Sequence, residues 1–240
     1  EADQAGDGAV KRHTDVCPIC DSTAWKPDGH LSDSRLAILA KYAVCDDCGA
    51  SWQMPPLYDF EAMYRSGEYR RLAGMDLDAC ISEQESRASV LLAYLKPRRA
   101  AIRRLLDFGS GVGSLMSAIR HHYGATVQGV ELDRDHAGYA NKHGLPTVWS
   151  LWILGGLVPF DLITSIHVFE HLTTPRQTMK ELAALLAPNG NMLIEVPLDA
   201  RMDFHPIAFT PQSLTRLATD AGLSVIECSE EIRLWAVKPE

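Results

Sequence analysis

The sequence is short of positive charge. Its 23 lysines and arginines are outnumbered by 31 aspartates and glutamates, which gives a net charge of −8 at pH 7. An acidic surface repels the phosphate backbone of a nucleic acid, so the composition disfavours a nucleic-acid partner. Two short basic stretches, residues 96–99 and 103–104, are the exceptions, and we interpret them as a solvated connection between elements.

A targeting segment and a long apolar run are also missing. The first eight residues are acidic and small, and the longest apolar stretch, residues 151–160, contains two glycines and a proline. A helix that spans a bilayer needs ~20 apolar residues. The sequence therefore predicts a soluble cytoplasmic protein without a membrane partner.

Cysteines are few, but four of the six form two closely spaced pairs, Cys17 with Cys20 and Cys45 with Cys48. Disulfides are rare in a reducing compartment, and two CxxC pairs can direct four sulfurs at one tetrahedral ion. We predict a structural Zn²⁺ site, because four thiolates leave no coordination position for a substrate. Two redox-active pairs are the alternative, and His30 is a possible replacement for one cysteine.

From residue 102 onward, short apolar runs alternate with amphipathic stretches, which is typical of βαβ units. We predict an α/β fold: a Rossmann-like, seven-stranded, mostly parallel sheet that ends in an antiparallel hairpin, with a small zinc-ribbon module before it. The expected division is a zinc-binding module at 1–56, a helical linker or lid at 57–100 and a Rossmann-like domain at 101–240. Strands are expected at 103–108, 126–131, 146–149, 161–166, 190–196, 223–228 and 232–237. Helices are expected at 59–69, 78–95, 113–122, 134–143, 175–187 and 211–221.

The most informative motif is DFGSGVG at residues 107–113, where a buried strand runs into a glycine-rich turn and then a helix. Glycines there let the backbone approach a ligand closely. Nicotinamide and flavin enzymes use similar turns, but this motif lacks the third glycine of GxGxxG at the expected spacing. The next strand ends at Glu131, whose carboxylate is placed to accept both hydroxyls of a ribose.

Several motifs together resemble the class I S-adenosylmethionine-dependent methyltransferases: DFGSGVG, GVELD (129–133), FDLITSIHVFEHL (160–172) and NMLIEVP (191–197). More narrowly, they resemble the branch that contains ubiquinone-biosynthesis-type O-methyltransferases and methyltransferases of sugar and polysaccharide pathways. This resemblance covers residues 102–237. Upstream, CPIC, CDDCGASWQMPP and YRSGEYR are similar to the zinc-ribbon leader of carbohydrate-pathway members.

The resemblance implies an S-adenosylmethionine site. By it, Asp107, Gly109, Gly111 and Gly113 hold the methionine end of the cofactor, Glu131 binds the ribose, Leu132 packs on the adenine, Ile166 faces the sulfonium, and Tyr64 and Tyr69 close over the cofactor. The family often has an acid after the third strand to hold the adenine, but residues 148–152 contain none. Ser150 or backbone groups are the expected substitutes.

Methyl transfer to a hydroxyl also requires a proton acceptor. Four candidates lie at the expected carboxyl ends of parallel strands, where open α/β sheets bind ligands: His167, Glu170, His171 and His205. Glu170 and His171 could instead be a pair that fixes the loop. Sugar C-methyltransferases with similar leaders have a Tyr-His-Glu cluster and a large C-terminal domain; here Phe204 replaces the tyrosine, so we expect an oxygen or nitrogen acceptor.

The sequence thus predicts a methyltransferase that acts on a small molecule, a sugar or glycoconjugate hydroxyl or amine. The alternatives are an RNA methyltransferase with a zinc module and a non-catalytic zinc-containing scaffold. The acidic charge disfavours the RNA enzyme, and the intact glycine turn with Glu131 disfavours the scaffold. The oligomeric state is left open.

Overall fold

The structure is a computed structural model that describes residues 16–31, 40–99, 101–154, 159–198, 201–202 and 204–240. Within these ranges, no helix is both long enough and apolar enough to cross a lipid bilayer.

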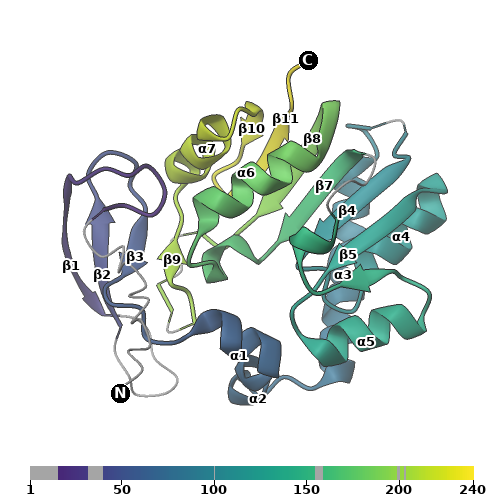
Figure 1. Ribbon diagram of the computed structural model, residues 1–240, viewed down its shortest axis with the longest axis horizontal. Coiled ribbons are helices and arrows are strands. Elements are labelled where there is room, and N and C mark those ends of the chain that lie inside the picture. The colour runs from purple at the N-terminus through teal and green to yellow at the C-terminus, as the bar shows by residue number, and fades with distance from the viewer. Residues whose placement is uncertain (1–15, 32–39, 100, 155–158, 199–200, 203) are drawn as a thin grey trace, which may run out of the picture.

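A seven-stranded sheet forms the centre of the molecule, with strand order β10-β11-β8-β7-β4-β5-β6 (Figure 1). Five strands run parallel, and β11 and β10 follow antiparallel at one edge. This arrangement confirms the expected fold class. The strands are β4 (Arg104–Phe108), β5 (Thr126–Val130), β6 (Thr147–Val148), β7 (Phe160–Ile166), β8 (Leu186–Glu195), β10 (Ser224–Cys228) and β11 (Arg233–Val237).

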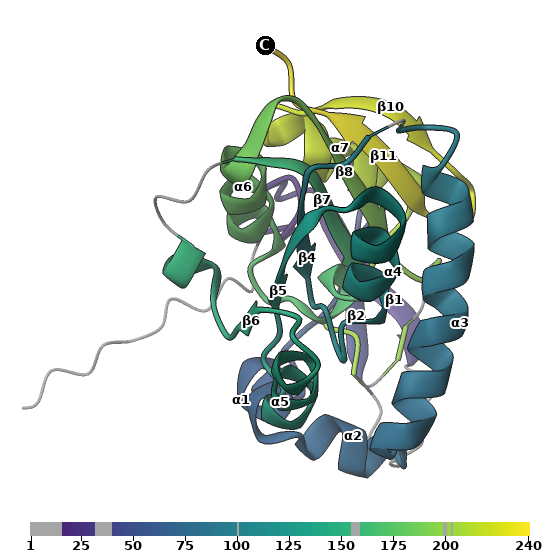
Figure 2. The same cartoon turned by 90° about the vertical axis from the view of Figure 1, so that its right-hand side faces the viewer.

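Helices cover both faces of this sheet, with α6 on one side and α3 on the other (Figure 2). The helices are α3 (Leu77–Leu95), α4 (Ser114–Tyr123), α5 (Arg134–Lys142), α6 (Pro175–Leu185) and α7 (Pro211–Asp220), with single 3₁₀ turns at η1 (Leu151–Leu154) and η2 (Phe169–His171). Helix α7 begins with a capping box between Thr210 and Ser213 and with Pro211 at its first position, which satisfies free backbone donors.

The expected helix at 59–69 is two short helices, α1 (Phe60–Ser66) and α2 (Glu68–Ala73). Gly67 separates them with a φ of 72°. This left-handed conformation ends one helix and starts the next, and glycine adopts it without a steric penalty. Both helices lie near the carboxyl ends of the parallel strands (Figure 1).

A second, four-stranded antiparallel sheet contains β1 (Trp25–Leu31), β2 (Lys41–Cys45), β3 (Ser51–Gln53) and β9 (Ile207–Ala208). The first three strands come from the expected zinc module. The fourth, β9, lies more than 150 residues later and pairs with β3 through Ser51–Ala208 and Trp52–Ile207. This sheet therefore crosses the expected boundary at residue 56, and the division into 1–56, 57–100 and 101–240 stays a prediction.

One hydrophobic core serves both sheets. The larger buried cluster joins Trp52 of β3, and Cys17 and Ile19 from the turn before β1, to Phe209 and Leu214 of the C-terminal half. Each of these side chains is at most 5% exposed. A module of ~50 residues buries too little surface to be stable alone, and here it shares the core of the large domain.

We predict that Phe209→Ala destabilises the whole chain by about 3–5 kcal/mol, because the ring is fully buried between the two sheets and its removal leaves a cavity. Chemical denaturation followed by fluorescence and by circular dichroism measures this, and both probes should report one transition. Ile226→Ala is the control, since this side chain is 62% exposed and its loss should change stability by less than about 0.5 kcal/mol. Two separate transitions would show that the sheets do not share a core.

Candidate active site and metal centre

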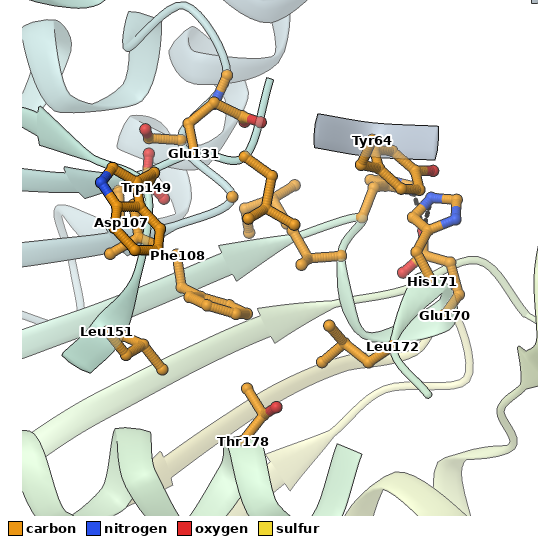
Figure 3. Close-up of a pocket in the computed structure, with 18 of the residues that line it drawn as sticks. Tyr64, Asp107, Phe108, Glu131, Trp149, Leu151, Glu170, His171, Leu172 and Thr178 are labelled. Carbon is orange, nitrogen blue, oxygen red and sulfur yellow. Dashed lines mark hydrogen bonds and ion pairs between the residues drawn. The ribbon is translucent and has the colours of Figure 1, made fainter. Parts of the chain in front are cut away.

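A cavity of about 1080 Å³ lies at the carboxyl ends of the parallel strands (Figure 3). Ligand sites occur at this edge of open α/β sheets. Most of the residues expected at the site line it: Tyr64, Tyr69, Asp107, Gly109, Gly111, Glu131, Leu132, Ser150, Ile166, His167, Glu170, His171 and His205. Gly113 is not among the lining residues.

The glycine turn gives the cavity its floor. Gly109 and Gly111 have φ values of 78° and 54°, and a Cβ at Gly109 would overlap Val168. Gly113 caps α4 with a φ of 86°, and a Cβ there would lie 2.7 Å from Leu145 Cδ1. Gly113 therefore permits close packing of α4 behind the turn.

The Glu131 carboxylate is held in one orientation beside this turn. Its Oε2 accepts a hydrogen bond from Gly111 N at 2.8 Å, and its Oε1 accepts one from Asp133 N at 2.8 Å. Burial raises the pKa of Glu131, against the effect of these hydrogen bonds. Each oxygen retains a second lone pair, so both can still accept a hydroxyl from the cavity.

Asp107 is a buried residue of β4 and lies opposite Thr164 of the neighbouring strand β7. Its Oδ1 accepts a hydrogen bond from Thr164 Oγ1 at 2.7 Å, and burial raises its pKa to about 7. The contact ties the end of β4 to its neighbour, which supports the turn that follows.

At the other end of the cavity, His167 lies between two carboxylates. Its Nδ1 is 3.4 Å from Glu170 Oε1, and its Nε2 is 3.4 Å from Glu195 Oε1. Burial disfavours the charged ring, but the two acids raise the pKa of His167 to about 9. At neutral pH this histidine is an imidazolium that compensates the buried acids.

His171 differs in charge and hydrogen bonding. Its Nδ1 is 2.8 Å from the Phe204 carbonyl oxygen, and a carbonyl can only accept, so Nδ1 carries the proton. Burial lowers the pKa of His171 to about 4, and the ring is neutral at pH 7. Its Nε2, 3.7 Å from Glu170 Oε1, therefore presents a lone pair.

His205 completes this cluster, because its ring centroid is 4.8 Å from that of His171. One donor atom each from Glu170, His171 and His205 lies within 4.8 Å of the others. Glu170 Oε2 is buried without a hydrogen-bond partner among the residues described. Two imidazoles and a carboxylate are suited to proton transfer, and they are also a donor set that divalent transition metals accept.

The two expected lid tyrosines pack against each other beside this cluster. The ring centroids of Tyr64 and Tyr69 are 4.6 Å apart, and the centroid of the Tyr64 ring is 5.0 Å from that of His171. Burial raises the pKa of both hydroxyls, so they remain protonated.

The sequence did not reveal a contribution from α3. Gln84 Oε1 accepts a hydrogen bond from Val112 N at 3.1 Å, and its side chain lies over Gly111. Arg87 lines the cavity from the next turn of the same helix. The pattern of residues 78–95 predicts a helix but does not place its polar face over the glycine turn.

The four paired cysteines form a compact cluster beside the small sheet: Cys17 and Cys20 precede β1, Cys45 ends β2, and Cys48 lies between β2 and β3. The Sγ atoms of Cys17 and Cys48 are 3.6 Å apart, as are those of Cys20 and Cys45. All four sulfurs lie within 4.8 Å of one another. A tetrahedral Zn²⁺ with bonds of ~2.3 Å places its sulfurs about 3.8 Å apart, so the four donors fit zinc. The side chain of His30 lies outside the described residues.

The family described as a methyltransferase domain matches residues 81–228, which is more than half of the chain. The chain belongs to this family. The ubiquinone biosynthesis O-methyltransferase of Caulobacter sp. (strain K31) is 33% identical over 100 residues, 38% of this chain and 39% of the relative. The C-methyltransferase NovU of Streptomyces niveus is 27% identical over 199 residues, 75% of this chain and 46% of NovU. The matches span less than half the length of these two relatives.

Solved structures show the same fold at low identity. CalS10, described as an amino pentose methyltransferase from Micromonospora echinaspora, superposes with a TM-score of 0.53 and 17% identity over 65% of this chain and 91% of CalS10. The sugar N-methyltransferase KedS8 from Streptoalloteichus sp. gives a TM-score of 0.55 and 13% identity over 72% of this chain and 92% of KedS8.

We predict that this chain binds one zinc ion. Because metal binding contributes folding energy, Cys45→Ser should lower the midpoint of thermal unfolding by roughly 10 °C. Metal analysis and differential scanning fluorimetry measure both effects. Cys228→Ser is the control, since this sulfur lies outside the cluster. A folded wild-type protein free of zinc would contradict the prediction.

We predict a pH-dependent contribution of His167 to stability. Its pKa of about 9 in the folded chain exceeds the usual 6.5, so its stabilisation is fully present below about pH 6.5 and is lost as the pH rises through 9. The stability difference between wild type and His167→Asn, measured by denaturation, should therefore shrink between pH 6.5 and 9. The surface variant His143→Asn provides the reference, and a constant difference for His167→Asn would refute the assignment.

Proposed function

We propose that this protein transfers a methyl group from S-adenosylmethionine to an oxygen or nitrogen atom of a small-molecule acceptor, a sugar or glycoconjugate hydroxyl or amine. The observation that supports this best is that one cavity holds both the fixed Glu131 carboxylate beside the glycine turn and the cluster of Glu170, His171 and His205. A cofactor end and an acceptor end are thus on opposite sides of one space.

S-adenosylmethionine supplies a methyl group on a positively charged sulfur. Glu131 would accept the ribose hydroxyls, and Leu132 and Ser150 would contact the adenine. Asp107, Gly109 and Gly111 would hold the methionine end, with Gly113 acting through the packing of α4. Ile166, at the end of β7, would then lie near the sulfonium, and Tyr64 and Tyr69 would close the cavity.

His171 and His205 are the proposed proton acceptors. The Nε2 lone pair of His171 can take the proton of an acceptor hydroxyl as its oxygen attacks the methyl group. The Glu170 carboxylate, 3.7 Å away, would stabilise the imidazolium that forms. His167 would act differently: already protonated, it keeps Glu170 ionised and holds the loop that carries it.

The acceptor class rests on the relatives and on one residue. CalS10 and KedS8 are described as amino pentose and sugar N-methyltransferases, and the Caulobacter relative as an O-methyltransferase. NovU is described as a C-methyltransferase, but the position before His205 is Phe204, which has no hydroxyl to share a proton. We therefore favour oxygen or nitrogen over carbon, and assign a structural Zn²⁺ to Cys17, Cys20, Cys45 and Cys48.

We predict that S-adenosylhomocysteine binds with low-micromolar affinity and that Glu131→Ala weakens binding by about 10–100-fold, because two hydrogen bonds to a charged acceptor are lost. Isothermal titration calorimetry measures both. Glu181→Ala is the control, since this exposed acid lies at the cavity edge on α6. A folded, zinc-loaded wild type that binds no S-adenosylhomocysteine would refute the proposed activity and favour a scaffold.

A further inference from the structure

The small sheet of β1, β2, β3 and β9, which we call the four-cysteine sheet, holds the segment that carries His205. We call residues 204–210 the return segment. Tyr42, on β2, is 2% exposed, and its hydroxyl lies 2.6 Å from the His205 carbonyl oxygen and 2.8 Å from the Met202 carbonyl oxygen. One buried hydroxyl thus contacts the main chain on both sides of Phe204.

Gln53, at the end of β3, adds two further contacts. Its backbone N–H donates to the Pro206 carbonyl oxygen at 2.9 Å, and its side-chain amide donates to the Met202 carbonyl oxygen at 3.2 Å. The next two residues of the return segment form β9 and pair with β3. An ion pair between Arg201 and Asp28, with Nε and Oδ2 2.9 Å apart, joins the segment's approach to β1.

The return segment in turn contacts His171. The Phe204 carbonyl oxygen accepts the hydrogen bond from His171 Nδ1 at 2.8 Å. The opposite ring nitrogen, Nε2, is 3.7 Å from the Glu170 carboxylate. A neutral imidazole has one ring proton, so the two acceptors compete for it. With Phe204 in place, the proton is on Nδ1 and the Nε2 lone pair is available.

We propose that the four-cysteine sheet is a positioning element of the acceptor site: Tyr42 and Gln53 fix the return segment, and the Phe204 carbonyl then holds His171 as the Nδ1–H tautomer. The inference rests on the proposed function for its catalytic meaning, because only that tautomer can accept a proton at Nε2. Tyr42 and Gln53 are positioning residues and do not line the cavity.

The charge of Glu170 determines which tautomer His171 adopts when its hydrogen bond to the Phe204 carbonyl is lost. If the Phe204 carbonyl moves away, Glu170 remains as the nearby acceptor, and its negative charge attracts the ring proton to Nε2. His171 then donates to Glu170 and has no lone pair on that nitrogen. Removal of the metal, which weakens β2 and β3, should have the same effect as removal of the Tyr42 hydroxyl.

The test is the ring-proton position of His171 in the full, zinc-loaded chain. Long-range proton–nitrogen spectra of protein labelled with ¹⁵N-histidine distinguish the two tautomers, and His171→Asn assigns the signal. For Tyr42→Phe we expect His171 to change from Nδ1–H toward Nε2–H, and amide exchange of the return segment to accelerate about tenfold, since one buried hydrogen-bond donor is lost. Affinity for S-adenosylhomocysteine should stay within about threefold of wild type, because Glu131 and the glycine turn keep their contacts.

The matched control is Tyr123→Phe, which removes a hydroxyl that donates to the Arg99 carbonyl oxygen at 3.3 Å and should leave His171 unchanged. Gln53→Met, which keeps the Tyr42 hydroxyl, should change the His171 tautomer in the same direction with smaller amplitude. The inference is overturned if Tyr42→Phe and Gln53→Met both fold, bind S-adenosylhomocysteine and retain His171 as Nδ1–H. Wild type that shows Nδ1–H but no S-adenosylhomocysteine binding would refute the proposed function and leave the positioning contact standing.

Discussion

β9 consists of two residues, and its pairing with β3 determines where the return segment lies. A polypeptide that leaves β8 at the carboxyl edge of the large sheet must return to start α7, and its backbone groups need partners where they are buried. The small sheet supplies them through the main-chain edge of β3 and through the side chains of Tyr42 and Gln53. Thr210 then caps α7 and also donates its hydroxyl to the Cys48 carbonyl oxygen at 3.2 Å. The same few residues thus start a helix, complete a sheet and line the cavity through His205.

Buried charge is the second constraint on the site. Glu170 is only 2% exposed, and a carboxylate so deeply buried needs a cation close by. His167 meets this need, and its own charge is shared with Glu195, whose pKa is held at about 2 by His167 and Arg233. Arg233, on β11, is 2.6 Å from Glu195. Positive and negative groups therefore alternate from β11 through β8 to the loop after β7, in the order Arg233, Glu195, His167 and Glu170. Two histidines four residues apart therefore have pKa values on opposite sides of neutrality: two acids raise the pKa of His167, whereas burial lowers that of His171 and outweighs the opposite effects of Glu170 and the Phe204 carbonyl.

The parts of this molecule that the sequence predicts are those with a local pattern. The parallel strands have apolar runs, the glycine turn has its motif, and the cysteine pairs have their spacing, so the seven-stranded sheet and four-cysteine cluster were both expected. β9 was not, because two residues carry no periodicity and their partner lies more than 150 positions away. For the same reason Tyr42, Gln53 and Gln84 had no signal in the sequence: an isolated tyrosine or glutamine becomes significant only through a distant backbone group. The histidines were recognised as candidates, but their division into charged and neutral depends on burial and on neighbours that folding brings together.

A structural metal can affect a reacting side chain that it does not contact. A Zn²⁺ ion bound by the four thiolates, as we propose, would stabilise β2 and β3, and these strands present Tyr42 and Gln53 to the return segment rather than to solvent. The small sheet has little core of its own, since its buried apolar side chains belong to one cluster with Phe209 and Leu214 of the large domain. Each half of the contact thus depends on the other: the large domain supplies the core that the small sheet lacks, and the small sheet supplies the hydrogen bonds that the return segment lacks. A closed metal site can in this way influence proton transfer without contacting the substrate, by fixing the backbone carbonyl that sets the tautomer of one histidine.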